Sequence, residues 1–143
     1  MTGRKQVVVS ASREVVGYDL ETGRRIWWAR GLGQNTNTIP QPVASDALVF
    51  AMSGFRNPNL MAIRSGREGD LTDTDAIVWQ NQRGNSYTAS PVLHDDILYV
   101  LTDSGMLSAV DAKTPAIVDG GIYLRGQSTL FAMVTAQGSG LRA

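Results

Sequence analysis

The 143-residue sequence contains no cysteine, a single histidine and no excess of either charge. The absence of cysteine excludes disulfides and thiolate metal sites, although it leaves the redox compartment open. Thirteen Lys and Arg residues balance thirteen Asp and Glu residues, so electrostatics gives no reason to expect nucleic acid or an anionic membrane as a partner. Apolar runs are far shorter than the ~20 residues that span a bilayer, and no transmembrane segment is expected.

Helical periodicity is also almost absent. Short apolar runs rich in Val, Ile, Leu and Tyr recur instead, bounded by Gly, Asp, Ser and Pro, which is typical of strands joined by hairpins. The sequence therefore predicts an all-β protein. The predicted strands are Gln6–Ser10, Glu14–Asp19, Arg25–Ala29, Pro42–Ala44, Leu48–Met52, Leu60–Arg64, Ile77–Gln80, Ser90–Leu93, Ile97–Thr102, Met106–Asp111, Ala116–Val118, Ile122–Arg125 and Thr129–Val134.

A Pro-headed element repeats along the chain. The pattern P-V-x-x-D-x-[IL]-x-[FY] starts at Pro42, starts again 49 residues later at Pro91, and returns with one extra residue at Pro115. Proline suits a first strand position, where a ladder donor is not needed, and the aspartate that follows suits a tight turn.

A second repeated element ends in an aspartate turn. Val15–Thr22 matches Leu107–Thr114 at a shift of 92 residues, and Asn59–Gly66 is a looser copy. In the first copy Gly23 follows the threonine, where a positive φ is expected, and a strand with Trp27 comes next. One unit thus holds four strands in about 40–50 residues, which is the size of a propeller blade.

The tryptophans have a role in this arrangement. A single blade cannot bury both faces of its sheet, and stacking neighbouring blades solves this. Tryptophan offers a large apolar surface together with an N–H that needs a partner. We therefore expect Trp27 and Trp79 to pack against the next blade rather than to stack on a planar ligand.

The pattern A-x-D-x-x-T-G-x-x-x-W resembles the tryptophan-docking repeat of the PQQ-type (quinoprotein alcohol dehydrogenase-like) β-propellers. That family includes quinoprotein dehydrogenases and the non-enzymatic outer-membrane assembly lipoproteins of Bam-complex type. Gly17–Trp27 fits the pattern with Gly17 in the alanine place, and Ala109–Thr114 fits its first half. Ala62–Gly66 departs from it, with Arg64 where Asp is usual and a longer run before Trp79. The resemblance implies a WD40- or YVTN-like propeller, exported to the periplasm or cell surface.

The repeat breaks at the junction of Thr114 and Pro115, where only 24 residues separate Pro115 from Pro91. A deletion or a splice of two blades explains this spacing. The chain also begins inside a blade, because Gln6–Val9 matches Leu98–Leu101 at a shift of 92 and no Pro-headed strand precedes it. We expect a partial β-propeller of about three four-stranded antiparallel blades over residues 1–134, with a junction near 114–115 and a flexible tail at 135–143. The valine run after Met1–Lys5 is too short for a signal peptide.

Candidate catalytic and metal-binding motifs all have a simpler interpretation. His94 lies in a polar turn. An EF-hand started at Asp73 would need glycine at its sixth position and an acidic residue at its twelfth, but Val78 and Gly84 stand there; Asp70–Asp75 is therefore interpreted as a connecting loop. Gly31–Gly33 lacks the third glycine of a dinucleotide-binding motif, and Lys113–Thr114 lacks the glycines of a P-loop.

No catalytic, cofactor-binding or metal-binding residue is therefore predicted. The polar tracts Gln34–Thr38 and Asn81–Ser86 precede successive Pro-headed strands and are expected on one rim, where they can form a binding surface. The favoured function is a non-catalytic scaffold that presents loops to a protein or polymer partner, with self-association through open blade edges as a further expectation. Two alternatives remain: a fragment of a PQQ-dependent dehydrogenase, and a truncated gene product without independent function.

Overall fold

A computed structural model describes residues 4–33, 38–54, 57–118, 121–125 and 130–134. Every regular element within these ranges is a strand, which confirms the predicted all-β class. None of the described residues belongs to a helix that is long and apolar enough to cross a membrane. The strands are β1 (Gln6–Ser10), β2 (Glu14–Asp19), β3 (Arg25–Arg30), β4 (Val43–Ala44), β5 (Leu48–Ser53), β6 (Asn59–Arg64), β7 (Gly69–Asp70), β8 (Ile77–Asn81), β9 (Val92–His94), β10 (Ile97–Leu101), β11 (Leu107–Asp111), β12 (Gly121–Arg125) and β13 (Leu130–Val134).

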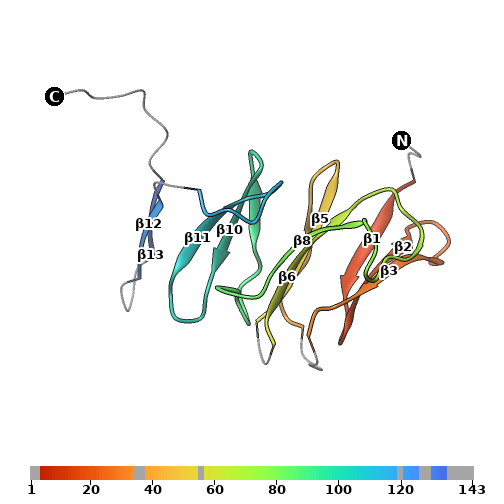
Figure 1. Ribbon diagram of the computed structural model, residues 1–143, viewed down its shortest axis with the longest axis horizontal. Coiled ribbons are helices and arrows are strands. Elements are labelled where there is room, and N and C mark those ends of the chain that lie inside the picture. Colours follow the sequence, from red (N-terminus) through yellow and green to blue (C-terminus); the bar gives the residue numbers. More distant parts are fainter. Residues whose placement is uncertain (1–3, 34–37, 55–56, 119–120, 126–129, 135–143) are drawn as a thin grey trace.

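The sheets lie in a row along the long axis of the molecule, in chain order (Figure 1). Blade 1 has the strand order β1-β2-β3-β7, blade 2 has β4-β5-β6-β8, and blade 3 has β9-β10-β11. Strands β12 and β13 pair with each other in a further two-stranded sheet. Blade 2 is the complete four-stranded antiparallel unit that the repeat predicts.

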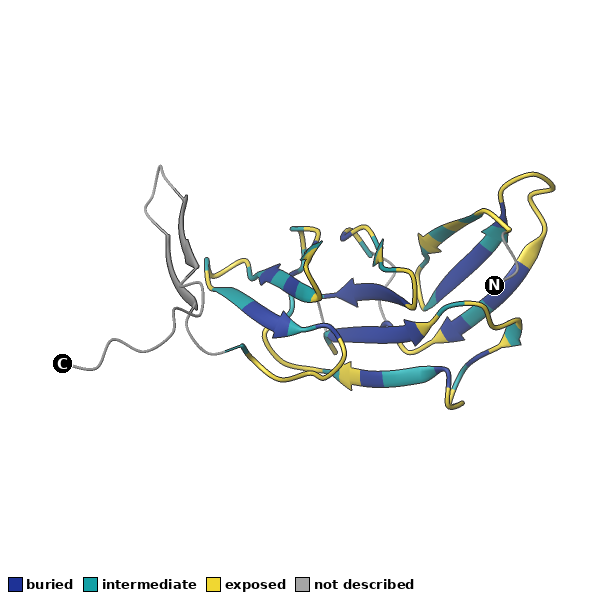
Figure 2. Ribbon diagram, turned by 90° about the horizontal axis from the view of Figure 1, so that it is seen from above, coloured by how far each residue is buried: buried dark blue, intermediate teal, exposed yellow. Residues whose placement is uncertain are grey.

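Two hydrophobic clusters fill the spaces between the blades, and β5 contributes to both. Its residues Val49 and Ala51 belong to the cluster shared with blade 1, whereas Leu48, Phe50 and Met52 belong to the cluster shared with blade 3. Side chains alternate across a strand, so a strand buried on both faces reads as the continuous apolar run LVFAM rather than as an alternation. Figure 2 shows this buried band running through the stacked strands.

The pairing of β1 corrects the predicted alignment of the first blade. Val8 pairs with Gly17, and in blade 3 Tyr99 pairs with Ala109, the residue that matches Gly17. Val8 therefore corresponds to Tyr99, at a shift of 91 rather than 92. A one-residue slip exchanges the two faces of a strand. In the corrected register Val8 faces the cluster shared with blade 2, so Val7 and Val9 point to the opposite face, where they are 43% and 42% exposed.

The longer run before Trp79 forms a strap that was not predicted. Strand β7 leaves blade 2 and adds a parallel strand to the edge of blade 1, with Trp27 opposite Gly69 and Trp28 opposite Asp70. Leu71, next along the strap, is 5% exposed within the cluster between blades 1 and 2. The interpretation of Asp70–Asp75 as a solvated connecting loop was therefore only partly right, because this segment ties two blades together.

The third Pro-headed element does not form the strand predicted at Ala116–Val118. Instead Ile117 makes an isolated antiparallel bridge with Val110 of β11. Backbone hydrogen bonds from Asp111 N to Ala116 O and from Val118 N to Ala109 O flank it, at 2.9 and 2.8 Å. The segment thus borders the edge of β11 where blade 2 has its Trp-bearing strand. The predicted tail at 135–143 lies outside the described residues.

The strap predicts an asymmetry between two leucines. Leu71→Ala should lower the free energy of unfolding by about 2–5 kcal/mol, since it leaves a cavity between blades 1 and 2. Leu20→Ala is the matched control, because Leu20 is 55% exposed, and it should change stability by less than about 0.5 kcal/mol. Urea unfolding followed by circular dichroism measures both; equal effects would contradict the strap.

Candidate functional site

The repeated aspartate turn has the same geometry at both ends of the described stack. The Asp19 carboxylate accepts hydrogen bonds from Glu21 N, Thr22 N and Thr22 Oγ1 at 3.0, 2.8 and 2.9 Å. Asp111 accepts from the backbone N–H groups of Lys113 and Thr114 at 2.8 and 2.9 Å. The D-x-x-T spacing is therefore a self-capped turn, and Gly23 completes the first copy at φ +68°.

These hydrogen bonds set the protonation of the aspartates. The backbone N–H of Thr22, and then its hydroxyl, hold the pKa of Asp19 below its ordinary value of 3.8. Backbone N–H groups of Thr114 and Lys113 lower the pKa of Asp111 in the same way. Both carboxylates are thus ionised turn caps rather than general acids.

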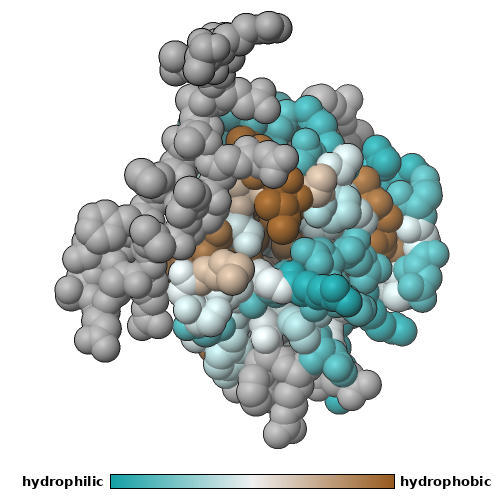
Figure 3. Space-filling model, turned by 60° about the vertical axis from the view of Figure 1, so that its left-hand side comes forward, coloured by the Kyte–Doolittle hydropathy of each residue, from teal (hydrophilic) through white to brown (hydrophobic). Residues whose placement is uncertain are grey.

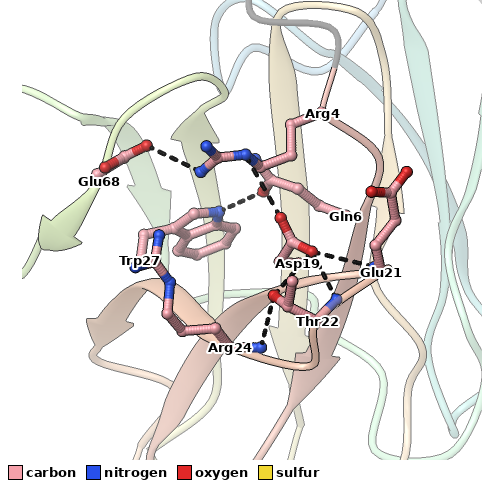
Figure 4. Close-up of polar contacts among 8 residues, drawn as sticks. All are labelled: Arg4, Gln6, Asp19, Glu21, Thr22, Arg24, Trp27 and Glu68. Atoms are coloured by element: carbon pink, nitrogen blue, oxygen red, sulfur yellow. Dashed lines mark hydrogen bonds and ion pairs between the residues drawn. The ribbon is translucent and has the colours of Figure 1, made fainter.

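Arg4 connects the first aspartate turn to the strap. Its guanidinium lies 3.4 Å from Asp19 and 3.4 Å from Glu68, as Figure 4 shows. Beside it, Gln6 Oε1 accepts the indole N–H of Trp27 at 2.8 Å. The sequence does not point to Arg4 or Gln6, because the residues that they bind, Asp19, Glu68 and Trp27, lie far away along the chain.

Trp79 confirms the predicted docking between blades. Its indole N–H donates to the backbone carbonyl of Ala112, in the aspartate turn of blade 3, at 3.1 Å. The Phe50 ring, two strands away in the same blade, packs against it with a centroid separation of 5.9 Å. Trp79 and Phe50 share their cluster with Leu98 and Val110 of blade 3.

Trp27 also lies between blades, but its indole N–H points back to its own blade instead of to the next one. The ring is 2% exposed and belongs to a cluster with Val49 and Ile63 of blade 2. Its N–H, however, bonds Gln6 within blade 1. Glycine at position 17 permits this placement, because a Cβ there would lie 2.1 Å from Trp27 Nε1.

Trp28 has a different role from its neighbour. It is half-buried, and the Arg25 guanidinium lies over its ring at 4.0 Å from the centroid, a cation–π contact. Its backbone carbonyl accepts the N–H of Leu71 at 2.8 Å. The adjacent tryptophans therefore serve two purposes: Trp27 packs against blade 2, and Trp28 lies on the strand edge that receives the strap.

A cleft of about 650 Å³ lies between blades 1 and 2 beside the Trp27 ring. It is lined by Arg4, Gln6, Val8 and Trp27 of blade 1 and by Ala44–Ala47, Val49 and Arg64–Gly66 of blade 2. Arg64 is exposed and has no carboxylate within ion-pairing distance among the described residues. We call this space the inter-blade cleft.

At the opposite end of the strands, hydrogen bonds tie the connecting segments of blade 1 to blade 2. The Ser53 hydroxyl donates to the carbonyl of Leu32, and Asn59 Nδ2 donates to the carbonyl of Gly31 at 2.7 Å. Leu32 itself is 1% exposed. Gly31–Gly33 is thus a loop, as predicted, and a packed one.

The polar tract after β8 is held just as firmly between blades 2 and 3. Ser86 is fully buried, and its backbone lies against Gly54, where a Cβ would come within 2.1 Å of it. The backbone N–H of Tyr87 and the hydroxyl of Thr88 donate to Asp103 of blade 3 at 2.8 and 2.7 Å. We name this end, with the described parts of Ala11–Arg13, 31–38, 82–89 and 102–106, the loop rim.

The remaining sequence candidates do not come together. His94 lies exposed before the β9–β10 turn, 3.2 Å from Asp95, and this turn is formed by Asp95 and Asp96 at positive φ. Lys113 bonds Asp96 at 2.6 Å. Among the described residues, no three His, Asp or Glu side chains are grouped so that they could hold a metal ion. Residues 34–37 of the first polar tract lie outside the description.

Hydrophobic side chains are exposed on blade 3, which faces the C-terminal end of the row. Val92, Met106 and Ile117 are 61%, 63% and 73% exposed. Figure 3 shows hydrophobic surface on this side of the molecule, interrupted by hydrophilic residues. These side chains do not form one face: Met106 and Ile117 line a cleft together with Leu60 of blade 2, and Ile117 lies opposite Val110, which packs in the cluster shared with blade 2.

Stacked four-stranded sheets with an indole ring between them define a partial β-propeller of tryptophan-docking type. The chain belongs to the family described as outer membrane protein assembly factor BamB, whose profile matches residues 1–121. This confirms the resemblance to PQQ-like propeller repeats.

A solved structure agrees with this assignment at the level of the fold. The crystal structure of BamB from Moraxella catarrhalis matches with a TM-score of 0.55 and 20% sequence identity, over 82% of this chain and 37% of that chain. The chain therefore spans little more than a third of that protein. No curated protein matches the sequence significantly.

The two docking tryptophans should differ in energetic cost. Trp79→Phe keeps a ring but leaves the Ala112 carbonyl without its donor, which should cost about 1–3 kcal/mol beyond the lost ring area. Trp27→Phe should cost less, because the half-buried Gln6 amide can turn to water. Chemical denaturation of the two variants measures the difference, and an equal or larger loss at Trp27 would contradict it.

The aspartate turn predicts a pH dependence. Because the folded pKa of Asp19 is lowered, its contribution to stability is present above the ordinary value of 3.8 and is lost as the pH falls through the folded value. Thr22→Val removes the hydroxyl and should raise the pKa of Asp19 part of the way back, since the backbone bond remains. Carboxyl ¹³C NMR titration measures it; Thr114→Val, at the other turn, should leave Asp19 unchanged.

Proposed function

We propose that this chain is a non-catalytic propeller segment that binds a protein partner in outer membrane protein assembly, at the periplasmic side of that membrane. The family description, an assembly factor rather than a dehydrogenase, supports this proposal. Because the chain covers 37% of the solved BamB, the proposal concerns the segment, whose contribution is one part of a larger binding surface.

The observation that carries the proposal is the hydrogen-bonded loop rim. Loops that are already fixed lose little conformational entropy on binding, so more of the contact energy appears as affinity. Here Asn59 fixes the connection between blades 1 and 2, and Ser86 and Asp103 both fix the connection between blades 2 and 3. The exposed side chains between these anchors, such as Arg83, form a preorganised surface for a partner.

A charge reversal on the loop rim tests the proposal. Arg83→Glu keeps the backbone bond from Arg83 N to Asn81 Oδ1 and should weaken binding about tenfold, as expected for loss of one hydrogen-bonded charge. The matched control is Arg24→Glu, an exposed arginine in the β2–β3 turn at the opposite rim, which should change binding less than about twofold.

Surface plasmon resonance with the purified outer membrane protein assembly complex, freed of its own BamB, measures the affinity. Binding by the unaltered chain and selective loss in Arg83→Glu would support the proposal. No binding, or equal loss in both variants, would contradict it.

A further inference from the structure

The inter-blade cleft exists because one blade junction departs from the other at three equivalent positions. The tryptophan at the junction of blades 2 and 3, Trp79, lies opposite Ala62, whereas Trp27 at the junction of blades 1 and 2 lies opposite Gly17. On the next strand, blade 2 has Phe50 opposite Ala62, and blade 1 has the smaller Val8 opposite Gly17. On the blade that receives the tryptophan, blade 3 has Asp111 at the end of β11, and blade 2 has Arg64 at the equivalent end of β6.

The first two replacements open the space. At the junction of blades 2 and 3, Trp79 crosses to the next blade and bonds Ala112, and Phe50 fills the room beside it. At the junction of blades 1 and 2, the Trp27 indole lies over Gly17 and bonds Gln6 instead. The smaller Val8 then leaves unfilled the volume that the corresponding phenylalanine occupies in blade 2.

The third replacement leaves a free positive charge at the mouth of the cleft. Where aspartate caps its own turn, as Asp19 does, its charge is used within the turn. Arg64 cannot cap the turn, and Gly66 makes it with a φ of +78°. Arg4 is held by Asp19 and Glu68, so among the described residues that line the cleft the guanidinium of Arg64 is the cation left for a ligand.

We propose that the inter-blade cleft binds a small organic acid, in which an aromatic or branched aliphatic body lies against Trp27, Val8 and Val49 and a carboxylate pairs with Arg64. A volume of about 650 Å³ lies within the range of small-molecule sites, which are mostly apolar with a few polar groups. A guanidinium matches a carboxylate through two parallel hydrogen bonds. Asp46, also on the cleft lining, disfavours a doubly charged phosphate.

The probe is 3-phenylpropionate, with 3-phenylpropionamide as its neutral counterpart and phenyl phosphate as the other anion. The indole N–H signals of the three tryptophans in ¹H–¹⁵N spectra are the readout, and Trp27→Phe assigns the signal of Trp27. We expect the carboxylate to shift the Trp27 signal with saturation, and the amide to bind at least about tenfold more weakly, because the charged hydrogen bond is missing.

Two variants and one control locate the site. Arg64→Gln should weaken the carboxylate about tenfold, whereas Arg67→Gln, an exposed arginine beside it that pairs with Asp75 outside the cleft, should leave binding unchanged. Gly17→Ala should displace the indole into the cleft and abolish binding; if this variant fails to fold, the pair of arginine variants decides the question.

The proposal is overturned if no probe shifts the Trp27 signal, if the amide binds as well as the acid, or if Arg64→Gln and Arg67→Gln behave alike. Tighter binding of phenyl phosphate than of the carboxylate would overturn the assigned ligand class. Loss of partner binding in the loop-rim experiment has no bearing on these outcomes, because the cleft lies between the blades and Arg83 lies on the loop rim.

Discussion

Packing of a tryptophan from one sheet against the next sheet is the interaction on which the stack depends. Each blade has two apolar faces and cannot fold alone with both exposed. Trp79 supplies both a large apolar surface and a hydrogen bond that crosses the junction. The aspartate turn on the receiving blade holds the accepting carbonyl in place, so turn and tryptophan act as one device.

The junction of blades 1 and 2 uses the same device in altered form. Trp27 still fills the interface, but its polar bond stays within its own blade, and the strap carrying Leu71 replaces the lost connection. Departures from the repeat at Gly17 and Arg64 thus have structural consequences: a cleft opens, and a second tie across the blades compensates for it.

The proposed binding function depends on the packing of the turns and loops. The described residues bring together ionised turn caps and packed polar loops, and the aspartates with lowered pKa are accounted for by turn hydrogen bonds. Rigidity would serve the proposed function, because fixed loops on stacked sheets form a surface that needs little reordering on binding.

The sequence by itself determined the strands, the repeat and the docking role of Trp27 and Trp79, because alternation, turn residues and spacing are local signals. It did not reveal the register of β1, since a one-residue slip leaves the apolar pattern of Gln6–Ser10 nearly unchanged. Nor did it reveal the strap or the cleft. Those were decided by tertiary structure: Leu71 is buried because the open edge of blade 1 receives the strap, and Arg64 borders a cleft because the neighbouring blade presents Val8 and Trp27 there.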